Sequence, residues 1–250
     1  MATARGAITC HAATPSRWRD VERLFGERGA CAGCWCMWPR LRGAEFARGR
    51  GAGNKRALRR LVAGGGRPGI IAYRGGEPVG WCAVAPREQY TRLERSRVMA
   101  PVDDQPVWSV VCFFVTPGAR RSGVTTALLR AAVDRAARGG ARIVEGYPLD
   151  SGGRKLADAF AWFGLASAFE RAGFKEMARR SKTRPIMRRS TRGAGGGAGR
   201  RAAGRPVGRR RPGAARPRPR SAPPSRLRGP AESPRRAPAR SASRRVGSRG

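Results

Sequence analysis

The segment from Val115 to Thr126, Val-Thr-Pro-Gly-Ala-Arg-Arg-Ser-Gly-Val-Thr-Thr, has the residue types and order that bind a diphosphate. An apolar, strand-like run precedes it and a helical pattern follows it, so a strand ends in a tight turn and a helix begins at once. The first turn of a helix has backbone N–H groups without helical partners and carries the positive end of the helix dipole. Placed after a strand, such a turn is suited to binding phosphate.

The side chains of the turn add to this site. Arg120 and Arg121 supply cationic donors suited to phosphates, and Thr125 and Thr126 supply hydroxyl donors in the same turn. Gly123 lets a ligand approach the backbone closely. The alternative is that the two arginines only solvate the start of a helix, but their place beside a glycine after a buried strand favours phosphate binding.

Two common nucleotide-binding patterns are missing from the sequence. No G-x-x-x-x-G-K-S/T occurs, and no G-x-G-x-x-G follows a strand. The diphosphate therefore belongs to another kind of ligand.

The elements that must position this turn can be predicted from periodicity and breakers. Residues 107–115 are apolar, β-branched and aromatic, which is typical of a strand buried on both faces. With the helix at 121–138 and the strand at 142–147 it forms a crossover between parallel strands. The turn at 75–78 joins two strands in a hairpin, and residues 87–106 form a long polar loop. The further predicted elements are helices at 16–28, 54–62 and 156–171, the hairpin strands at 69–74 and 79–85, and one or two closing strands within 174–187.

The two ends of the 250-residue chain differ in composition. From about residue 190 onward almost every residue is Arg, Pro, Gly, Ala or Ser. Such a stretch cannot bury enough apolar surface to offset its loss of chain entropy, so we expect it to be disordered. The predicted organisation is one folded domain at 1–189, which contains all the Trp and Cys, and a basic tail at 190–250.

The formal net charge of +37 has two explanations. A basic tail attracts polyanions, which predicts weak, non-specific nucleic-acid binding. Arg in place of Lys also arises from coding bias alone, and no aromatic residue in the tail offers a stacking platform for bases. The chain has neither a membrane-spanning apolar run nor a secretory signal at its N-terminus, so we expect a cytoplasmic protein with reduced thiols.

The turn resembles the acetyl-CoA signature of the GNAT acetyltransferases, V-x-P-x-x-R-R-x-G, whose core Q/R-x-x-G-x-G/A is represented here by Arg120, Gly123 and Thr125. Thr125 departs from the usual small residue. Further similarity lies in the hairpin around Pro78-Val79-Gly80 and in residues 169–174, Phe-Glu-Arg-Ala-Gly-Phe, which resemble the late Y-E-x-x-G-F motif of the family. The resemblance implies the GNAT fold, an α/β (α+β) domain with a central mixed sheet flanked by helices.

The resemblance also implies a site. Acetyl-CoA, the co-substrate, would lie where the strand at 107–115 splays from the strand at 142–147, and a backbone N–H there would stabilise the oxyanion. Phe169 stands where the family often has a tyrosine that protonates the leaving thiolate, so Glu145 and Tyr147, near the end of a bordering strand, are the candidates for base and acid. The alternative is that Glu145 pairs with an arginine and Tyr147 packs. The residues expected at the cofactor are Phe113, Phe114, Val115, Arg120, Arg121, Ser122, Gly123, Val124, Thr125 and Thr126.

The segment Cys31–Trp38 admits three interpretations. Cys31, Cys34 and Cys36 suggest zinc, yet a closed site needs a fourth ligand, and nothing marks Cys10 or His11 for it. We therefore predict no metal and favour a packed segment between the first two helices. In GNAT proteins this region borders the acceptor, so Trp35 and Trp38 are also candidates for an acceptor pocket.

Three functions follow from these features. The first is transfer of an acetyl group from acetyl-CoA to a primary amine. The second is a catalytically reduced, GNAT-like protein that binds CoA or nucleic acid. The third is a basic nucleic-acid-binding protein in which the signature occurs by chance. Acceptor loops vary freely on this fold, so the acceptor is not specified by the sequence.

Overall fold

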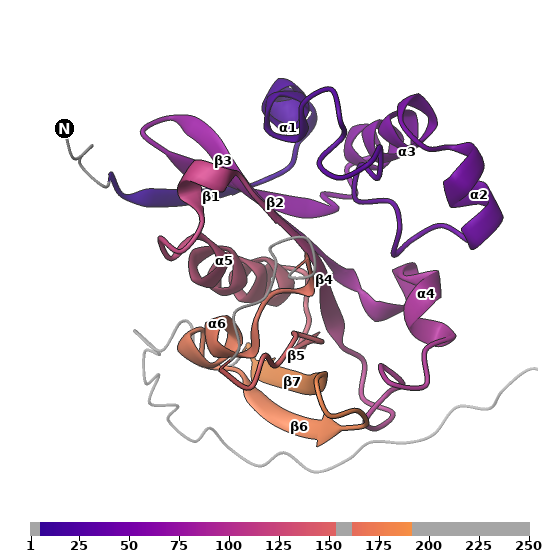
Figure 1. The fold of residues 1–250 in the computed structure, drawn as a ribbon, viewed down its shortest axis with the longest axis vertical. Helices are drawn as coiled ribbons and strands as arrows, with labels where there is room; N and C mark the ends of the chain where they lie inside the picture. The colour runs from indigo at the N-terminus through magenta and orange to yellow at the C-terminus, as the bar shows by residue number, and fades with distance from the viewer. Residues whose placement is uncertain (1–5, 154–161, 192–250) are drawn as a thin grey trace, which may run out of the picture. The chain divides into compact units, whose positions relative to one another are not determined.

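A computed structural model describes residues 6–153 and 162–191. Seven strands form one mixed sheet in the order β1-β2-β3-β4-β5-β7-β6 (Figure 1). This confirms the predicted α/β architecture with a central mixed sheet. The strands are β1 (Ile8–Ala12), β2 (Gly69–Arg74), β3 (Glu77–Pro86), β4 (Trp108–Val115), β5 (Ile143–Gly146), β6 (Lys175–Arg179) and β7 (Pro185–Ser190).

Helices cover both faces of the sheet. In Figure 1, α5 and α6 lie on one side and α1 and α3 on the other. Each face has its own apolar cluster: Leu128 and Leu129 of α5 are fully buried on one, and Trp81 and Val21 on the other. The described helices are α1 (Trp18–Phe25), α2 (Gly43–Arg48), α3 (Ala52–Ala63), α4 (Thr91–Glu94), α5 (Val124–Arg138) and α6 (Ala166–Arg171).

The hairpin and the crossover are confirmed. β2 and β3 pair antiparallel around the turn at Gly75 and Gly76, which both have positive φ. β4 and β5 are parallel and are joined through α5. β4 is buried from both sides, since Val110 belongs to the α5 cluster and Val111 to the opposite one.

Four sequence predictions were incomplete or wrong. The edge strand β1 was missed because it has only five residues and alternates between half-buried and exposed positions. α2 lies between the helices expected at 16–28 and 54–62, where no helix was predicted, and α4 interrupts the predicted loop at 87–106. α5 begins at Val124, three residues later than expected, because Arg121 (φ 56°) and Gly123 (φ 86°) are left-handed and cannot belong to a right-handed helix.

Some predictions fall outside the described residues. Of the helix expected at 156–171, residues 162–171 are described, and α6 covers only Ala166–Arg171; the prediction was too long there because Gly164 has a φ of 82° and Leu165 forms a bridge with Leu149. Of the predicted tail, only Ser190, the last residue of β7, and Thr191 are described, so the domain boundary and the disorder stay predictions. Within the described ranges, no helix is both long and apolar enough to cross a bilayer.

Candidate active site

β4 and β5 pair over only a short length. Their register joins Trp108, Ser109 and Val110 of β4 to Val144, Glu145 and Gly146 of β5. β4 continues for five more residues to Val115, still paired with β3 up to Gly80. The second half of β4 therefore has a strand on one side and a gap on the other, which is the splay that the sequence predicted.

The direction of the backbone groups along this gap follows from one hydrogen bond. The Thr116 N–H donates to the Val79 carbonyl of β3 over 3.0 Å. Because alternate residues of an antiparallel strand bond to the same neighbour, Phe114 also faces β3 and the amides of Phe113 and Val115 face the gap. Within the described residues, no strand pairs with those two amides on that side.

The turn after β4 directs the start of α5 toward the same gap. A short 3₁₀ turn, Pro117–Ala119, ends the strand, and Gly123 caps α5 in the left-handed conformation. The Val124 side chain is buried in the core beneath the helix. Val124 can thus contribute to a ligand only through its backbone, whereas Arg121 and Gly123 are exposed.

Arg74, which the sequence analysis missed, fixes the conformation of this turn. Its Nη2 donates to the Ser122 Oγ over 2.7 Å and to the Ser122 carbonyl over 3.3 Å. The Ser122 hydroxyl in turn donates to the Ala119 carbonyl over 2.6 Å. Ser122 is therefore engaged within the protein, and Arg74 brings a further positive charge to the start of α5. Only the position of β2 between β1 and β3 in the sheet places Arg74 here, so no local pattern could have revealed it.

Gly80 of β3 sets how closely α5 approaches the sheet. A Cβ at this position would lie 2.6 Å from Val124 Cγ1 and 3.2 Å from Leu128 Cδ1. The absence of a side chain at Gly80 lets the first turn of α5 pack directly on the strand. The predicted Pro78-Val79-Gly80 segment thus packs against the first turn of α5.

A cavity of about 670 Å³ connects this turn with the N-terminal segment of the chain. Its volume lies within the usual range for a small-molecule site. Five of the residues predicted at the cofactor line it together: Phe113, Phe114, Val115, Arg120 and Thr125. The opposite part of the wall consists of Phe25, Ala30, Cys31, Cys34, Cys36, Trp38, Pro39, Phe46, Trp81, Cys112 and Trp162.

The segment Cys31–Trp38 takes an unusual backbone path to form this wall. Ala30, Ala32, Trp35 and Cys36 all have φ between 46° and 68°. Left-handed conformations of non-glycine residues are strained and occur where the surrounding structure imposes them, often at functional sites. Packing holds the segment here, since the Trp35 ring stacks on Trp18 at 6.2 Å.

The two tryptophans proposed for an acceptor pocket have different positions. Trp35 is buried and does not line the cavity, so it packs in the core next to the lining residues. Trp38 lines the cavity and lies edge-to-face with Trp162, with ring centroids 4.8 Å apart. Trp162 was missed because it is far from Trp38 in the sequence.

Two cysteines of the cavity wall, Cys34 and Cys112, are held in the thiol form. Burial raises the pKa of Cys34 to about 11, and the pKa of Cys112 is also raised, chiefly by a hydrogen bond with Cys36 and by burial. Cys36 Sγ accepts a hydrogen bond from the Trp81 indole N–H over 3.1 Å. All six cysteines lie in the described ranges and none forms a disulfide. No group of three or more metal-ligating side chains occurs among the described residues.

Glu145 and Tyr147, the predicted base and acid, lie in a buried polar network. Both side chains are inaccessible to solvent, and neither lines the cavity. Tyr147 donates to Glu145 Oε1 over 2.6 Å, and its hydroxyl pairs with the Ser109 hydroxyl at 3.0 Å and accepts from Arg87. Burial and the Glu145 charge raise the pKa of Tyr147 far above its ordinary value. Their catalytic role stays a prediction.

Two arginines neutralise Glu145. Arg188 Nε of β7 donates to Oε2 over 2.6 Å, and Arg87 Nη1 lies 3.2 Å from Oε1. Arg87 also donates to the Met99 carbonyl over 2.6 Å. The network joins β4, β5, β7 and the turn directly after β3 next to the point where β4 and β5 separate, so it fixes the geometry of the splay.

Phe169 of the late motif packs in the core. A Cβ on Gly146 would lie 2.2 Å from its ring, and the ring meets Phe113 edge-to-face at 6.1 Å. The position where the family often has a tyrosine therefore supports β4 from behind. No proton donor is available from this side chain.

The described residues thus contain a split parallel strand pair, a glycine-capped helix at its end and a cavity along the open edge. Residues 38–147 match the family model described as "Acetyltransferase (GNAT) family". Residues 38–147 are therefore a GNAT acetyltransferase domain, as the signature indicated. Membership of this family supports an N-acetyltransferase activity in general. No curated protein sequence matches the chain.

Solved structures with a similar fold include acetyltransferases of low sequence identity. The PaiA N-acetyltransferase of Thermoplasma acidophilum, in complex with coenzyme A, is 11% identical over 74% of this chain and 99% of its own, with a TM-score of 0.43. An N-acetyltransferase of Staphylococcus aureus is 9% identical over 75% of this chain and 100% of its own, with a TM-score of 0.44. The family assignment rests on the family model.

Proposed function

We propose that this protein transfers an acetyl group from acetyl-CoA to the nitrogen of a primary amine by direct attack on the thioester. The observation that carries the proposal is the cavity along the open edge of β4, which runs from the start of α5 to the Cys31–Trp38 segment. Its two ends suit the two substrates. The diphosphate of acetyl-CoA fits the α5 end, and the amine fits the aromatic end.

The residues at the α5 end would bind the diphosphate. The N–H groups of Val124, Thr125 and Thr126 lie in the first helical turn, where they have no helical acceptor. Arg120 and Arg121 flank that turn, and Thr125 also lines the cavity. These donors and charges match the geometry and the negative charge of a diphosphate.

The open edge of β4 would hold the pantetheine arm. Amides of Phe113 and Val115 facing the gap can pair with the pantetheine amides as a neighbouring strand would. An N–H in the same stretch can donate to the thioester oxygen and stabilise the oxyanion that forms when the amine attacks. A C–N bond then forms and the C–S bond breaks, and the proton lost by the nitrogen ends on the sulfur of CoA.

A second candidate is a protein that binds CoA without catalysis. It is favoured by the composition of the cavity wall, where the described lining residues include no Asp, Glu, His or Tyr. Without such a side chain, proton transfer would have to proceed through water or through Glu145 and Tyr147 after rearrangement.

Acetyl-CoA and an amine panel separate the candidates. Both candidates predict that acetyl-CoA raises the melting temperature of the protein. Only the enzyme produces CoA and an acetylated amine, which should be followed by chromatography, because the exposed Cys31 thiol would react with thiol reagents. No thermal shift would contradict both candidates. A rise in melting temperature without any acetylated product would support the candidate that binds CoA without catalysis.

Nucleic-acid binding by residues 190–250 and a cytoplasmic location stay predictions. If the basic tail binds DNA, binding should weaken steeply with salt and disappear when these residues are deleted. Salt-sensitive binding that persists in the deleted chain would assign it to the folded part.

A further inference from the structure

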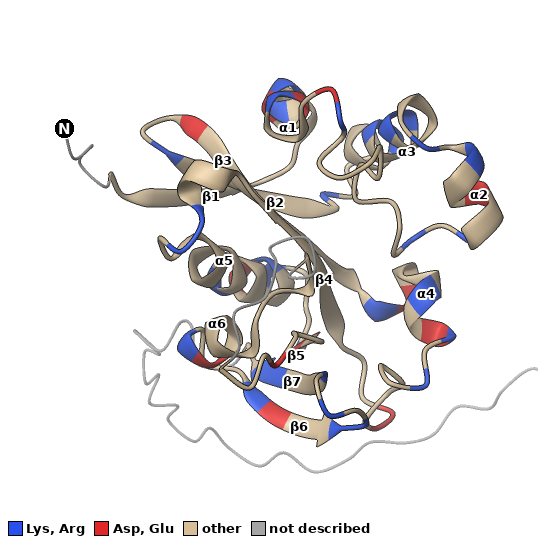
Figure 2. Ribbon diagram, viewed as in Figure 1, with Lys and Arg blue, Asp and Glu red and all other residues tan. Residues whose placement is uncertain are grey.

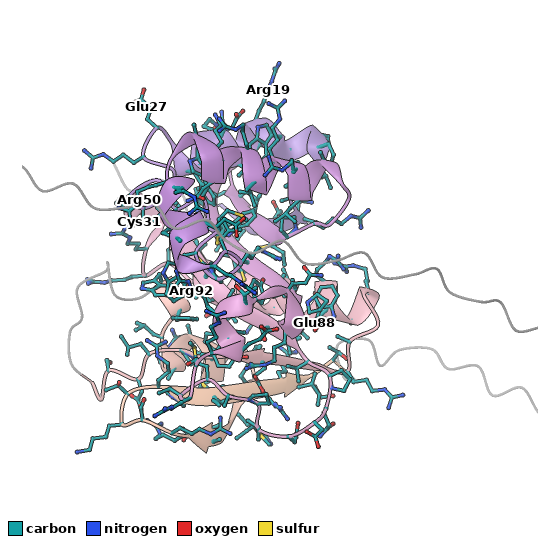
Figure 3. The ribbon with its side chains drawn as sticks, turned by 90° about the vertical axis from the view of Figure 1, so that its right-hand side faces the viewer. Arg19, Glu27, Cys31, Arg50, Glu88 and Arg92 are labelled. Atoms are coloured by element: carbon teal, nitrogen blue, oxygen red, sulfur yellow. The ribbon has the colours of Figure 1, made fainter. Side chains whose placement is uncertain are left out.

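The acceptor end of the cavity combines aromatic walls with arginines at its opening. Trp38, Phe46 and Trp162 line this end. Cys31, labelled in Figure 3, both lines the cavity and is exposed. The cavity therefore opens beside this residue. The Gly51 N–H bonds to the Gly33 carbonyl over 2.9 Å, which ties the chain next to Arg50 to the loop that follows Cys31.

Two arginines lie against these aromatic walls. The Arg92 guanidinium stacks over the Trp38 ring at 4.3 Å and its Nε donates to the Trp38 carbonyl over 2.8 Å. The Arg50 guanidinium lies 5.8 Å from the Phe46 ring centroid. Figure 3 shows both on the face where Cys31 is exposed. Among the described residues, no ion pair joins either arginine to a carboxylate, so both charges are available to an anionic group.

The cavity disfavours cationic amines. No carboxylate occurs among its described lining residues, so an ammonium group would lose its hydration without gaining a counter-ion. Figure 2 shows further Lys and Arg on α3, which has no acidic residue and adds to the repulsion of polycations. An amine that is easily deprotonated is favoured, and the α-amino group at the N-terminus of a peptide titrates at about 7.7–8.0, against about 10.4 for a lysine-type amine.

Resting on the proposed acetyltransferase function, we propose that the acceptor is an α-amine that carries an aromatic side chain and a carboxylate. Aromatic amino acids and short peptides with these groups share this chemistry. The aromatic group packs against the cavity-lining faces of Trp38 and Trp162, and the carboxylate meets Arg50 and Arg92 at the opening. The neutral amine then attacks the thioester at the β4 end of the cavity.

An amine comparison tests this inference on the full chain with saturating acetyl-CoA. L-Tryptophan and the dipeptide Trp-Gly carry all three groups, tryptamine lacks the carboxylate, and spermidine lacks the carboxylate and the ring. One of the first two should exceed tryptamine in kcat/KM by about tenfold or more, which is the size of one charge-assisted contact. Spermidine should be slower than tryptamine by a further factor of about ten. Comparing kcat/KM for L-tryptophan with that for Trp-Gly shows whether the preferred acceptor is the free amino acid or the peptide.

Two variants assign the contacts. Arg50→Gln should lower kcat/KM for the preferred acceptor about tenfold and leave tryptamine within about twofold. Trp162→Leu should lower kcat/KM for both the preferred acceptor and tryptamine, and should leave the Kd of acetyl-CoA unchanged. The matched control is Arg19→Gln, at an exposed arginine of α1 that is labelled in Figure 3. This variant should leave kcat/KM unchanged for both amines.

Several results would overturn the inference. Spermidine turning over as fast as tryptophan and Trp-Gly would overturn it and leave the acetyltransferase function intact. An Arg50→Gln variant that affects tryptamine as strongly as the carboxylate-bearing acceptor would also overturn it, because the arginine would then not contact the carboxylate. No product with any amine would overturn both the inference and the proposed enzyme.

Discussion

The substitution Glu145→Gln tests whether the buried network at β5 is structural. The side chain of Glu145 is inaccessible to solvent, and those of Arg188 and Arg87 are only 6% and 13% exposed. Glutamine keeps the size of the side chain and one carbonyl oxygen. It removes the charge that balances the two guanidinium groups and leaves them buried without it.

The expected loss can be worked from these contacts. Removing one partner of a buried ion pair costs about 3–5 kcal/mol. Arg188 keeps Asp103 as a partner at 2.7 Å and Arg87 keeps the Met99 carbonyl, so we expect the lower end, about 3 kcal/mol. With an m-value for urea unfolding of about 2 kcal/mol per molar, the urea concentration at the unfolding midpoint should fall by about 1.5 M. Tryptophan fluorescence during urea unfolding at pH 7 measures it.

The matched control is Glu176→Gln at an exposed pair. Glu176 and Arg179 lie 2.6 Å apart with side chains 40% and 34% exposed. Such a pair contributes less than about 1 kcal/mol, so this variant should be close to wild type. If Glu145→Gln lowers the unfolding free energy by less than about 1 kcal/mol and instead abolishes acetyl transfer, the structural account of Glu145 is wrong. The predicted catalytic role would then stand.

Three further predictions concern the turn and its surroundings. Gly123→Ala should lower the unfolding free energy by about 1–2 kcal/mol because φ is 86°, whereas Gly118→Ala, with an equally open Cβ position and no positive φ, should be neutral in the same urea assay. Gly80→Ala should push the first turn of α5 off β3, costing about 1–3 kcal/mol and weakening acetyl-CoA binding by calorimetry; an unchanged Kd would contradict the packing argument. Arg188 lowers the pKa of Asp103 from 3.8 to about 2, so the pair stabilises the protein above pH 3.8 and that stability is lost as the pH falls toward 2. The difference in unfolding free energy between wild type and Asp103→Asn should shrink over that range, and a difference independent of pH would refute the assignment.

The strand, turn and helix start proposed to bind the diphosphate could be predicted from sequence because their determinants are local. A buried strand, a Pro-Gly turn and Gly123 lie within twenty residues, and each limits the backbone in a known way. The exact start of α5 was missed because the left-handed conformation of Arg121 has no sequence signal. It depends on the packing of the turn against β2 and β3.

The acceptor end could be predicted only in outline. The Cys31–Trp38 segment was recognised as a candidate by its composition. Its partner Trp162 comes from a distant part of the chain, and the left-handed conformations of Trp35 and Cys36 are imposed by tertiary packing. The partners of Glu145 were hidden for the same reason, since Arg87 and Arg188 meet it only through the sheet order β3-β4-β5-β7.

Calorimetric titration of acetyl-CoA into the wild-type chain and into Gly123→Glu and Gly123→Ala tests the central claim most directly. The account predicts one site in the wild type and Gly123→Ala. Gly123→Glu should bind at least about 100-fold more weakly, since a like charge about 4 Å from a phosphate costs several kcal/mol even at an effective dielectric of about 20. Equal affinity in wild type and Gly123→Glu, or no binding by the wild type, would contradict a diphosphate at the start of α5.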